Sequence, residues 1–429
     1  MAENKRVPSI RFAGFEQEWD KKQFDDVFDM ITNNTLSRDN LNYIDGSTQN
    51  VHYGDILTVF GEYVDASIAE LPFLNDEEIA CKFQNAILND GDIIIADTAE
   101  DEVVGKCVEI GNIGEKKILA GLHTIPCRPK EKFAPKYMGY YLNSDAYHQK
   151  LLPLMQGVKV IAISKSGVKG TEIIVSSDFK EQEKIGIFLS HLDEKIKQTE
   201  AKINRLMLLK QSMMIKMFPK EGESEPEIRF KGFSEDWEQR KLGEMMEVTS
   251  VKRIHQSDWK DSGVRFLRAR DIVAKSKKEN VNEPLFISQE KYDEYSAVSG
   301  KVKKGDLLVT GVGTIGVPML VNIEEPLYFK DGNIIWFKNE NVIDGRFFYY
   351  SFYGLNIQKF IKKSAGTGTV GTYTIENGKK TPINLPPKKD EQVKIGEYFS
   401  TLDHLITLHQ QKLQKLKNMK SACMKRMFV

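Results

Sequence analysis

The sequence lacks the cysteine and histidine spacings that bind metals or form disulfide frameworks. Its four cysteines are scattered without a CxxC pair, and its seven histidines form no HExxH motif. Closely spaced cysteines are what zinc sites and disulfide-rich folds require. We therefore expect no metal ion, and reduced thiols that are mostly packed. The cysteines are Cys81, Cys107, Cys127 and Cys423.

Long apolar runs are also missing. No run approaches the ~18 residues that a membrane helix needs, and the opening MAENKR leads into no apolar signal core. We therefore expect a cytoplasmic protein that does not enter a membrane. The 41% hydrophobic and 28% charged residues are the ordinary mixture of globular chains. At ~100–200 residues per domain, the length of the chain suits roughly two to four domains.

The sequence has no excess of positive charge, with 61 basic and 61 acidic residues. The net charge therefore gives no argument for a nucleic-acid partner. The distribution differs between the halves, because residues 20–150 contain 12 Lys and Arg against 23 Asp and Glu, whereas residues 238–380 contain 23 against 18. The two halves carry opposite local charge.

Phosphate-binding and catalytic motifs are missing as well. No GxxxxGKS/T loop occurs, and NLPPKK (384–389) departs from the Asn/Asp-Pro-Pro-aromatic motif of adenine methyltransferases by an inserted leucine and a missing aromatic residue. GVGTIG (311–316) and GTGTVG (366–371) match GxGxxG, but a dinucleotide site needs those glycines between a strand and a helix. VPMLV and TYTI follow them instead, which is typical of strands or loops. A stand-alone enzyme is the weakest interpretation.

The sequence does contain an internal duplication. IRFAGFEQEW (10–19) returns as IRFKGFSEDW (228–237), and EQEKIGIFLSHLDEKI (181–196) returns as DEQVKIGEYFSTLDHLI (390–406). The segments between these repeats share a pattern of residue types more than identical residues, since NDGDIIIADTAE (89–100) parallels KKGDLLVTGVGT (303–314). Because repeats define an architecture, this layout predicts two variable segments, each enclosed by a copy of the opening motif and a copy of the later repeat. We call these repeated parts the frame.

The end of each repeat predicts a long helix with a coiled-coil seam. Apolar residues follow spacings of three and four over more than four heptads, with polar interruptions at Thr199 and His409 and at Lys210 and Lys420. A compact pairing of the two helices must be antiparallel, and about 33 residues at ~1.5 Å rise give a length of ~50 Å. The predicted seam residues are Ile185, Leu189, Leu192, Ile196, Ile203 and Leu206 in the first copy, and Ile395, Phe399, Leu402, Ile406, Leu413 and Leu416 in the second.

The variable segments contain short strand-like runs at 54–60, 91–97, 305–311 and 333–339, and aromatic-rich helical stretches in KYMGYYLNS and RFFYYSFYGLNIQKFI. We predict an α/β (α+β) fold with two domains separated by two long antiparallel coiled-coil helices. The predicted boundaries are 1–178 for the first domain, 179–219 for the first helix, 220–227 for an acidic linker, 228–388 for the second domain and 389–429 for the second helix.

Together these features resemble the specificity subunit of type I restriction-modification enzymes. The IRFxGFxxxW openings, the two variable segments and LPPKKDEQVKIGEYFSTLDHLI before the second helix carry the resemblance, although the first copy lacks the paired prolines. The resemblance implies a non-catalytic subunit with two target-recognition domains. Each would read one half of a split, asymmetric site in double-stranded DNA.

The resemblance also implies partners that supply the chemistry. Two modification (methyltransferase) subunits would bring S-adenosylmethionine and adenine methylation, and restriction (translocase/nuclease) subunits would bring ATP and Mg, translocation and cleavage. The helices would set the distance between half-sites, and ~50 Å is a little more than one DNA turn of ~34–36 Å.

Candidate DNA contacts come from residue types that bind base edges or phosphates. In the second domain these lie in VRFLRARDI, where two arginines at alternate positions are expected on one face of a strand, and in nearby basic pairs. In the first domain they lie in NNTLSRDN and QGVKV. The candidates are Arg265, Arg268, Arg270, Lys252, Arg253, Lys362 and Lys363 in the second domain, and Asn33, Asn34, Ser37, Arg38 and Lys159 in the first.

Two alternatives stay open at this level. Each candidate residue could instead belong to a solvated face or a buried ion pair. The whole chain could also be a coiled-coil adaptor whose variable domains bind proteins. Because phosphate binding needs local positive charge, the acidic first domain predicts weak DNA binding by the isolated chain.

Overall fold

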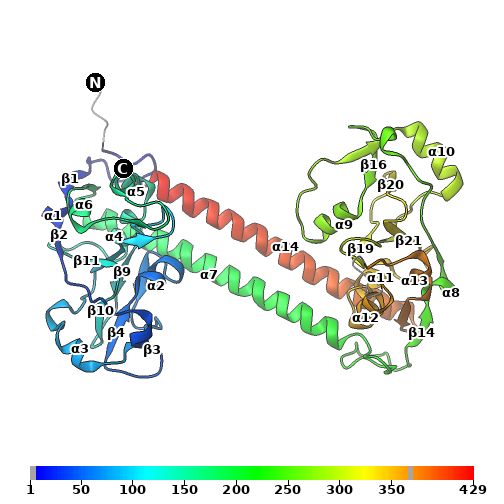
Figure 1. The fold of residues 1–429 in the computed structure, drawn as a ribbon, viewed down its shortest axis with the longest axis horizontal. Helices are drawn as coiled ribbons and strands as arrows, with labels where there is room; N and C mark the ends of the chain where they lie inside the picture. Colours follow the sequence, from blue (N-terminus) through cyan, green and yellow to red (C-terminus); the bar gives the residue numbers. More distant parts are fainter. Residues whose placement is uncertain (1–5, 366–370) are drawn as a thin grey trace. The chain divides into compact units, whose positions relative to one another are not determined.

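The computed structural model describes residues 6–365 and 371–429 and divides the chain into two compact units (Figure 1). The first unit comprises residues 1–200 and 411–429, and the second comprises residues 201–410. Two long helices, α7 (Phe179–Lys216) and α14 (Lys389–Arg426), contribute one part to each unit. No helix in the described part of the chain combines the length and the hydropathy of a membrane span.

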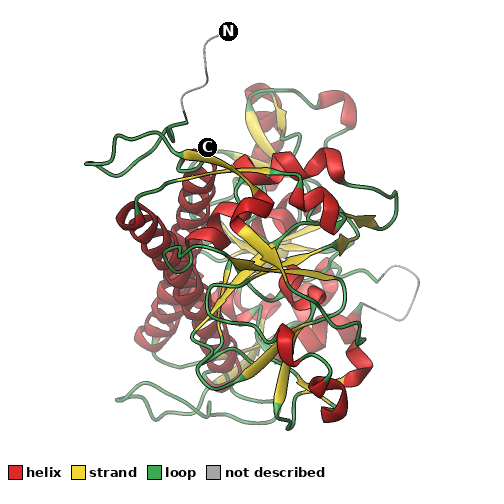
Figure 2. Cartoon of the chain, turned by 90° about the vertical axis from the view of Figure 1, so that its left-hand side faces the viewer, coloured by secondary structure: helices red, strands yellow, loops and turns green. Residues whose placement is uncertain are grey.

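The first unit is a mixed structure of short helices and strands (Figure 2). Its strands are β1 (Asp20–Gln23), β2 (Phe28–Met30), β3 (Leu41–Asn42), β4 (Thr48–Val51), β5 (Tyr63–Asp65), β6 (Phe73–Leu74), β7 (Ile93–Ala96), β8 (Thr98–Ala99), β9 (Cys107–Gly111), β10 (Lys117–Ala120), β11 (Thr124–Pro129), β12 (Ile161–Ala162) and β13 (Glu172–Val175). The main sheets have the orders β2-β11-β7-β9-β5 and β10-β4-β6-β3. β5 and β9 pair in parallel, as do β4 and β10.

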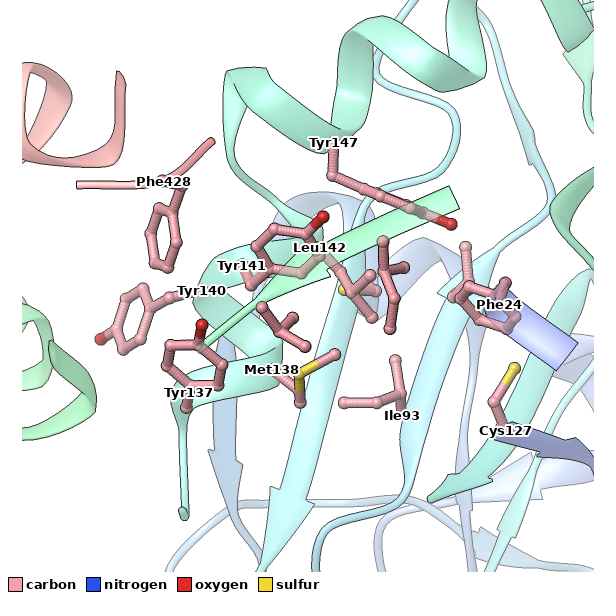
Figure 3. Close-up of a cluster of buried hydrophobic side chains, with 14 of the residues drawn as sticks. Phe24, Ile93, Cys127, Tyr137, Met138, Tyr140, Tyr141, Leu142, Tyr147 and Phe428 are labelled. Carbon is pink, nitrogen blue, oxygen red and sulfur yellow. The ribbon is translucent and has the colours of Figure 1, made fainter. Parts of the chain in front are cut away.

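The core of the first unit is rich in aromatic side chains. Phe428, just beyond α14, has its ring centroid 5.8 Å from that of Tyr141 and 6.1 Å from that of Tyr137 (Figure 3). Large buried rings contribute strongly to packing, so this cluster fixes the end of α14 on the first unit. The short helices are α1 (Phe24–Val27), α2 (Tyr53–Thr58), α3 (Glu77–Cys81), α4 (Tyr137–Leu142), α5 (Asp145–Leu151) and α6 (Lys165–Lys169).

The second unit repeats this plan with different details. Its strands are β14 (Glu238–Lys241), β15 (Glu247–Thr249), β16 (Val264–Leu267), β17 (Leu285–Ile287), β18 (Leu307–Thr310), β19 (Pro318–Leu320), β20 (Leu327–Phe329), β21 (Ile334–Lys338) and β22 (Pro382–Leu385). The main sheets have the orders β15-β21-β18-β19 and β17-β16-β20, and β16 pairs with β20 in parallel. Its short helices are α8 (Leu242–Met245), α9 (Ala269–Ser276), α10 (Gln289–Ser299), α11 (Gly345–Ser351), α12 (Leu355–Ser364) and α13 (Ile375–Lys380).

The duplicated frame is visible in the strand registers. β1 pairs antiparallel with β13, with Asp20 opposite Val175, and β14 pairs with β22, with Glu238 opposite Leu385. The predicted α/β fold class with two domains and two long helices is confirmed. The strand-like runs at 91–97, 305–311 and 333–339 coincide with β7, β18 and β21.

The prediction of a strand at residues 54–60 is wrong, because this stretch forms most of α2. His52 caps the helix by accepting a hydrogen bond from the backbone N–H of Gly54 at 3.1 Å. A side-chain cap satisfies a donor that the first helical turn would otherwise leave unpaired, and it overrides the strand preference of the apolar residues.

The long helices pair antiparallel within each unit. In the first unit Asp193 of α7 contacts Lys420 of α14 at 2.6 Å, and Glu200 contacts Lys417 at 2.7 Å, so the numbering of one helix rises as that of the other falls. In the second unit Lys210 contacts Asp403 at 2.6 Å. All twelve predicted seam residues are buried or half-buried.

The lysines that interrupt the apolar seam belong to a repeated cluster. Asp193 also accepts a hydrogen bond from the hydroxyl of Tyr140 in α4 at 2.6 Å, and Asp403 accepts one from Tyr350 in α11 at 2.7 Å. Each cluster of lysine, aspartate and tyrosine therefore joins both long helices to a short helix of the same unit. In the first unit Lys420 additionally binds Glu62 at 2.8 Å.

Each opening segment is anchored by a buried ion pair. Arg11 donates two hydrogen bonds to the carboxylate of Glu181, at 2.5 and 2.9 Å, and Arg229 donates two to Glu391, at 2.7 and 2.9 Å. Glu181 and Glu391 lie in the first turn of α7 and α14 and are almost fully buried. Trp19 also donates to Glu181, at 3.1 Å. The repeated arginine of the opening motif thus meets the repeated helix start, whereas the indole N–H of Trp237 has no hydrogen-bond partner among the described residues.

Replacing Arg11 with methionine leaves the Glu181 carboxylate buried without its cation. Because breaking a buried pair in this way costs about 3–5 kcal/mol, we expect Arg11→Met to lower the free energy of unfolding of the first unit by that amount. Hydrogen exchange measured by mass spectrometry reports each unit separately. Arg6→Met is the control, since the Arg6–Glu18 pair is exposed and such pairs contribute ~0–1 kcal/mol. Equal exchange in the two variants would contradict the prediction.

A second buried carboxylate makes the first unit sensitive to pH. Glu109 of β9 accepts hydrogen bonds from the backbone N–H groups of Lys136 and Gly139 at the start of α4. Burial raises the pKa of Glu109 from 4.5 to about 7, against the lowering effect of those hydrogen bonds. Because the folded-state pKa is the higher one, this residue's stabilising contribution is complete below pH 4.5 and is lost as the pH rises through about 7.

We therefore expect the first unit to lose roughly 3 kcal/mol of this contribution between pH 4.5 and 7. Glu109→Gln keeps an acceptor but cannot titrate, so it should flatten that pH dependence. The measurement is hydrogen exchange of α4 over this pH range. Glu115→Gln, at an exposed site, is the matched control and should keep the wild-type slope.

Candidate nucleic-acid interface

The three candidate arginines of the second unit gather where β16 meets α9. Arg268 is the N-cap of α9, and its guanidinium donates to Asp271 at 3.0 Å. Arg265 extends from β16 and approaches Asp271 at 3.6 Å, and burial lowers the pKa of its guanidinium. Arg270 lies in the first turn of α9, and 62% of its side chain is exposed. Two of the three arginines are therefore engaged by the buried carboxylate of Asp271.

The prediction that Arg268 and Arg270 share one face of a strand is wrong. β16 ends at Leu267, and the backbone N–H of Arg268 donates to the Asp271 carboxylate at 3.0 Å. This bond to the Asp271 carboxylate begins a helix, in which side chains two residues apart do not face the same side.

The first unit has a similar arginine–aspartate pair at α2. Arg38 binds Asp55 through two hydrogen bonds, at 2.7 and 3.0 Å, which raise the pKa of the guanidinium. Asp55 lies four residues after the end of β4, as Asp271 lies four residues after the end of β16. Burial lowers the pKa of His52, and its Nδ1 accepts from Gly54, so the neutral ring carries its proton on Nε2.

The three other candidates near residue 35 differ in accessibility. Asn34 is buried, and its amide donates to Asn50 at 2.7 Å. Asn33 is half-buried and accepts from the Lys165 ammonium at 3.0 Å. Ser37 is exposed. Asn34 therefore supports the loop from inside, whereas Asn33 and Ser37 stay candidates for contacts at the surface.

The remaining basic candidates lie away from these clusters along the chain and are all exposed. Lys252 packs its ammonium over the ring of Tyr295 at 4.1 Å. Lys362 and Lys363 lie in the last turn of α12. Their roles stay predictions. Lys159 precedes β12, and Arg253 follows Lys252.

The glycine motifs have structural explanations where they are described. GVGTIG connects β18 to β19, so no helix follows it. A Cβ atom on Gly311 would lie 2.6 Å from the carbonyl oxygen of Tyr373, which explains why glycine stands there. Residues 366–370 of GTGTVG lie outside the described residues.

Sequence reasoning did not identify Asp55 and Asp271, which position the candidate arginines. A signal was available, because VHYGDI (51–56) and LRARDI (267–272) both place an aspartate before an isoleucine at the start of a helix. Aligning the two variable segments on this feature would have matched the two sites.

The comparisons with known proteins identify the family. The sequence model of the type I restriction modification DNA specificity domain matches residues 16–208 and 234–418. This chain belongs to that family. The two matches cover most of the chain and coincide with its two repeats, so the resemblance of the sequence to type I specificity subunits is confirmed.

Curated relatives carry the same description. A putative type I restriction enzyme specificity subunit of Haemophilus influenzae is 32% identical over 39% of this chain and 41% of its own length. The MjaVIII specificity subunit of Methanocaldococcus jannaschii is 28% identical over 57% of this chain, which spans 58% of that relative. The putative MjaX specificity subunit of the same organism is 24% identical over 95% of this chain and 92% of its own.

Solved structures share the fold. The S subunit of a type I restriction-modification system from M. genitalium has a TM-score of 0.59 at 16% identity and covers 99% of both chains. A chain from a structure on complex assembly and conformational transition of the type I R-M system has a TM-score of 0.52 at 16% identity, over 95% of this chain and 96% of that one.

Removing the charge of Asp271 tests its positioning role. Because hydrogen bonds to charged groups contribute about 1.5–3 kcal/mol, we expect Asp271→Asn to lower the free energy of unfolding of the second unit by that amount and to increase hydrogen exchange in α9. Asp261→Asn, at an exposed site before β16, is the control. Unchanged exchange in α9 of Asp271→Asn would show that Arg265 and Arg268 are held by other groups.

Proposed function

We propose that this protein is the DNA-reading subunit of a type I restriction-modification complex, in which each unit binds one half of a split, asymmetric site in double-stranded DNA. The observation that carries the proposal is the double match to the DNA specificity domain, once in each repeat. Two matched domains on one duplicated frame are suited to two half-sites.

The differences between the units support an asymmetric site. The frame residues are the same in both copies, as in the pairs Arg11–Glu181 and Arg229–Glu391. The variable segments differ in charge, with 12 basic against 23 acidic residues at 20–150 and 23 against 18 at 238–380. Base sequence is read by the side chains that reach base edges, and the two variable segments differ in residue composition.

In this proposal the chain itself is not catalytic, and the chemistry belongs to its partners. Two modification subunits would bring S-adenosylmethionine and methylate adenine, and restriction subunits would use ATP and Mg for translocation and cleavage. The names of the relatives, specificity subunits of type I restriction enzymes, support this division of roles. The long helices would set the spacing between the half-sites.

Mapping of methylated adenine in genomic DNA tests the proposal. The chain is expressed together with the modification subunit of its own operon in a host without other adenine methylation. We expect a split motif to be methylated, with two unlike half-sites and a fixed gap, and we expect no such motif when the chain is omitted.

Methylation without a sequence motif, or the same motif without the chain, would contradict the proposal. Either outcome would favour the alternative of a coiled-coil adaptor that binds proteins through its variable domains. Co-purification of the chain with the modification subunit distinguishes a failure of assembly from a failure of DNA reading.

A further inference from the structure

In each unit, two parallel strands end at the same edge of a sheet. β4 and β10 pair in parallel in the first unit, and β16 and β20 do so in the second (Figure 1). The turns that follow are also equivalent, because Gly121 donates its backbone N–H to Val51 at 2.9 Å and Lys330 donates to Leu267 at 2.8 Å. Ligands of α/β proteins commonly bind outside the carboxyl ends of parallel strands.

In the second unit this carboxyl edge contains a hollow to which three basic residues contribute. Its volume is about 430 Å³. Arg270 and Lys330 form only loose ion pairs, with Glu283 at 3.8 Å and Asp331 at 3.5 Å. The Arg270–Glu283 pair is also exposed, and such pairs contribute little stability, so a ligand can replace it. The Lys330 and Asp331 side chains are only 26% and 23% exposed. The lining residues are Trp259, Arg268, Ala269, Arg270, Lys330 and Asn333.

The hollow also contains groups suited to base edges. Asn333 presents an amide with both donors and an acceptor, and Arg270 presents a planar fork of donors. The indole N–H of Trp259 is buried and has no hydrogen-bond partner among the described residues. Phosphates and guanine edges accept such donors, and an asparagine amide matches the edge of adenine.

In the first unit the same edge carries aromatic and imidazole rings beside Arg38. The ring of Tyr53 lies 4.6 Å from that of His52 and 5.2 Å from that of His123. His123 is 46% exposed, and its Nδ1 lies 3.4 Å from the Thr98 hydroxyl and 3.4 Å from Asp97. Aromatic rings stack on bases, and imidazole nitrogens hydrogen-bond to base edges.

The chain positions of these groups correspond. The carbonyl oxygen of His123 accepts from Asp97 at 3.1 Å, and that of Asn333 accepts from Gly311 at 2.8 Å, each from the residue after an equivalent strand. His52 and Arg268 both cap the helix that follows the first parallel strand. At corresponding positions the two units therefore carry different side chains. His123 corresponds to Asn333, and His52 corresponds to Arg268.

We infer that these two carboxyl edges are the DNA-reading surfaces, with Tyr53 and His123 contacting one half-site and Arg270, Lys330 and Asn333 contacting the other. This inference rests on the proposed function and names the residues that would contact the DNA. Asp55 and Asp271 bind the arginines beside these edges and do not contact DNA in this assignment.

Methylation mapping with single variants tests the assignment in the assembled complex. Arg270→Ala and Asn333→Ala should relax or abolish one half of the methylated motif and leave the sequence of the other half unchanged. His123→Asn should do the same to the opposite half, and asparagine suits the left-handed backbone there, where φ is 56°. Loss of one good base contact lowers discrimination about 10- to 100-fold.

The control variants change basic residues away from these edges. Lys117 is an exposed residue at the amino end of β10, and Lys304 is 62% exposed and 4.0 Å from Glu324, which precedes β20. Lys117→Ala and Lys304→Ala should keep the wild-type motif. Should Arg270→Ala fail to assemble, Arg270→Lys makes the same test, because lysine keeps the charge without the bidentate fork.

The outcomes distinguish a failure of this assignment from a failure of the proposed function. A wild-type motif in all three edge variants would overturn the inference and leave the proposed function intact. Relaxation of both halves by a single variant would also overturn it, because each edge is assigned to one half-site. A wild-type complex without any split motif would instead overturn the proposed function.

Discussion

The frame of this protein depends on a buried carboxylate at the start of each long helix. Glu181 and Glu391 are the acceptors to which the arginine of each opening motif binds. Because a buried charge is costly without its partner, this interaction fixes where the opening segment meets the helix, and with it the β1–β13 and β14–β22 pairs. The variable segments are inserted between these fixed points, so they can differ while the frame stays the same.

A second constraint joins the helices to the domains. The clusters around Asp193 and Asp403 place a lysine from one long helix, an aspartate from the other and a tyrosine from a short helix in mutual contact. An apolar seam alone permits sliding of one helix along the other, whereas a half-buried charged pair specifies a single register. The polar interruptions of the heptad pattern therefore define the alignment of α7 with α14 in each unit.

The carboxyl edges show how one frame can present two chemistries. Positions fixed by strand ends and helix caps carry histidine and tyrosine in one unit and arginine, lysine and asparagine in the other. Backbone bonds to the carbonyl oxygens of His123 and Asn333 hold the turns that carry them, so the exposed side chains can change while those bonds stay. The groups that hold the fold are therefore different from the side chains that are exposed at the edges.

The duplication, the two long helices and the mixed α/β class followed from the sequence alone, because heptads and repeated motifs are local patterns that survive without knowledge of contacts. Several strands were also predictable, but α2 was not, because its cap at His52 competes with a strand-like apolar run. Only the tertiary structure decided that Arg268 caps a helix, that Asn34 is buried, and that His123 and Asn333 occupy matching edges. The matching edges depend on parallel pairs between segments more than 50 residues apart, and no periodicity in the chain encodes which ends such a pair brings together.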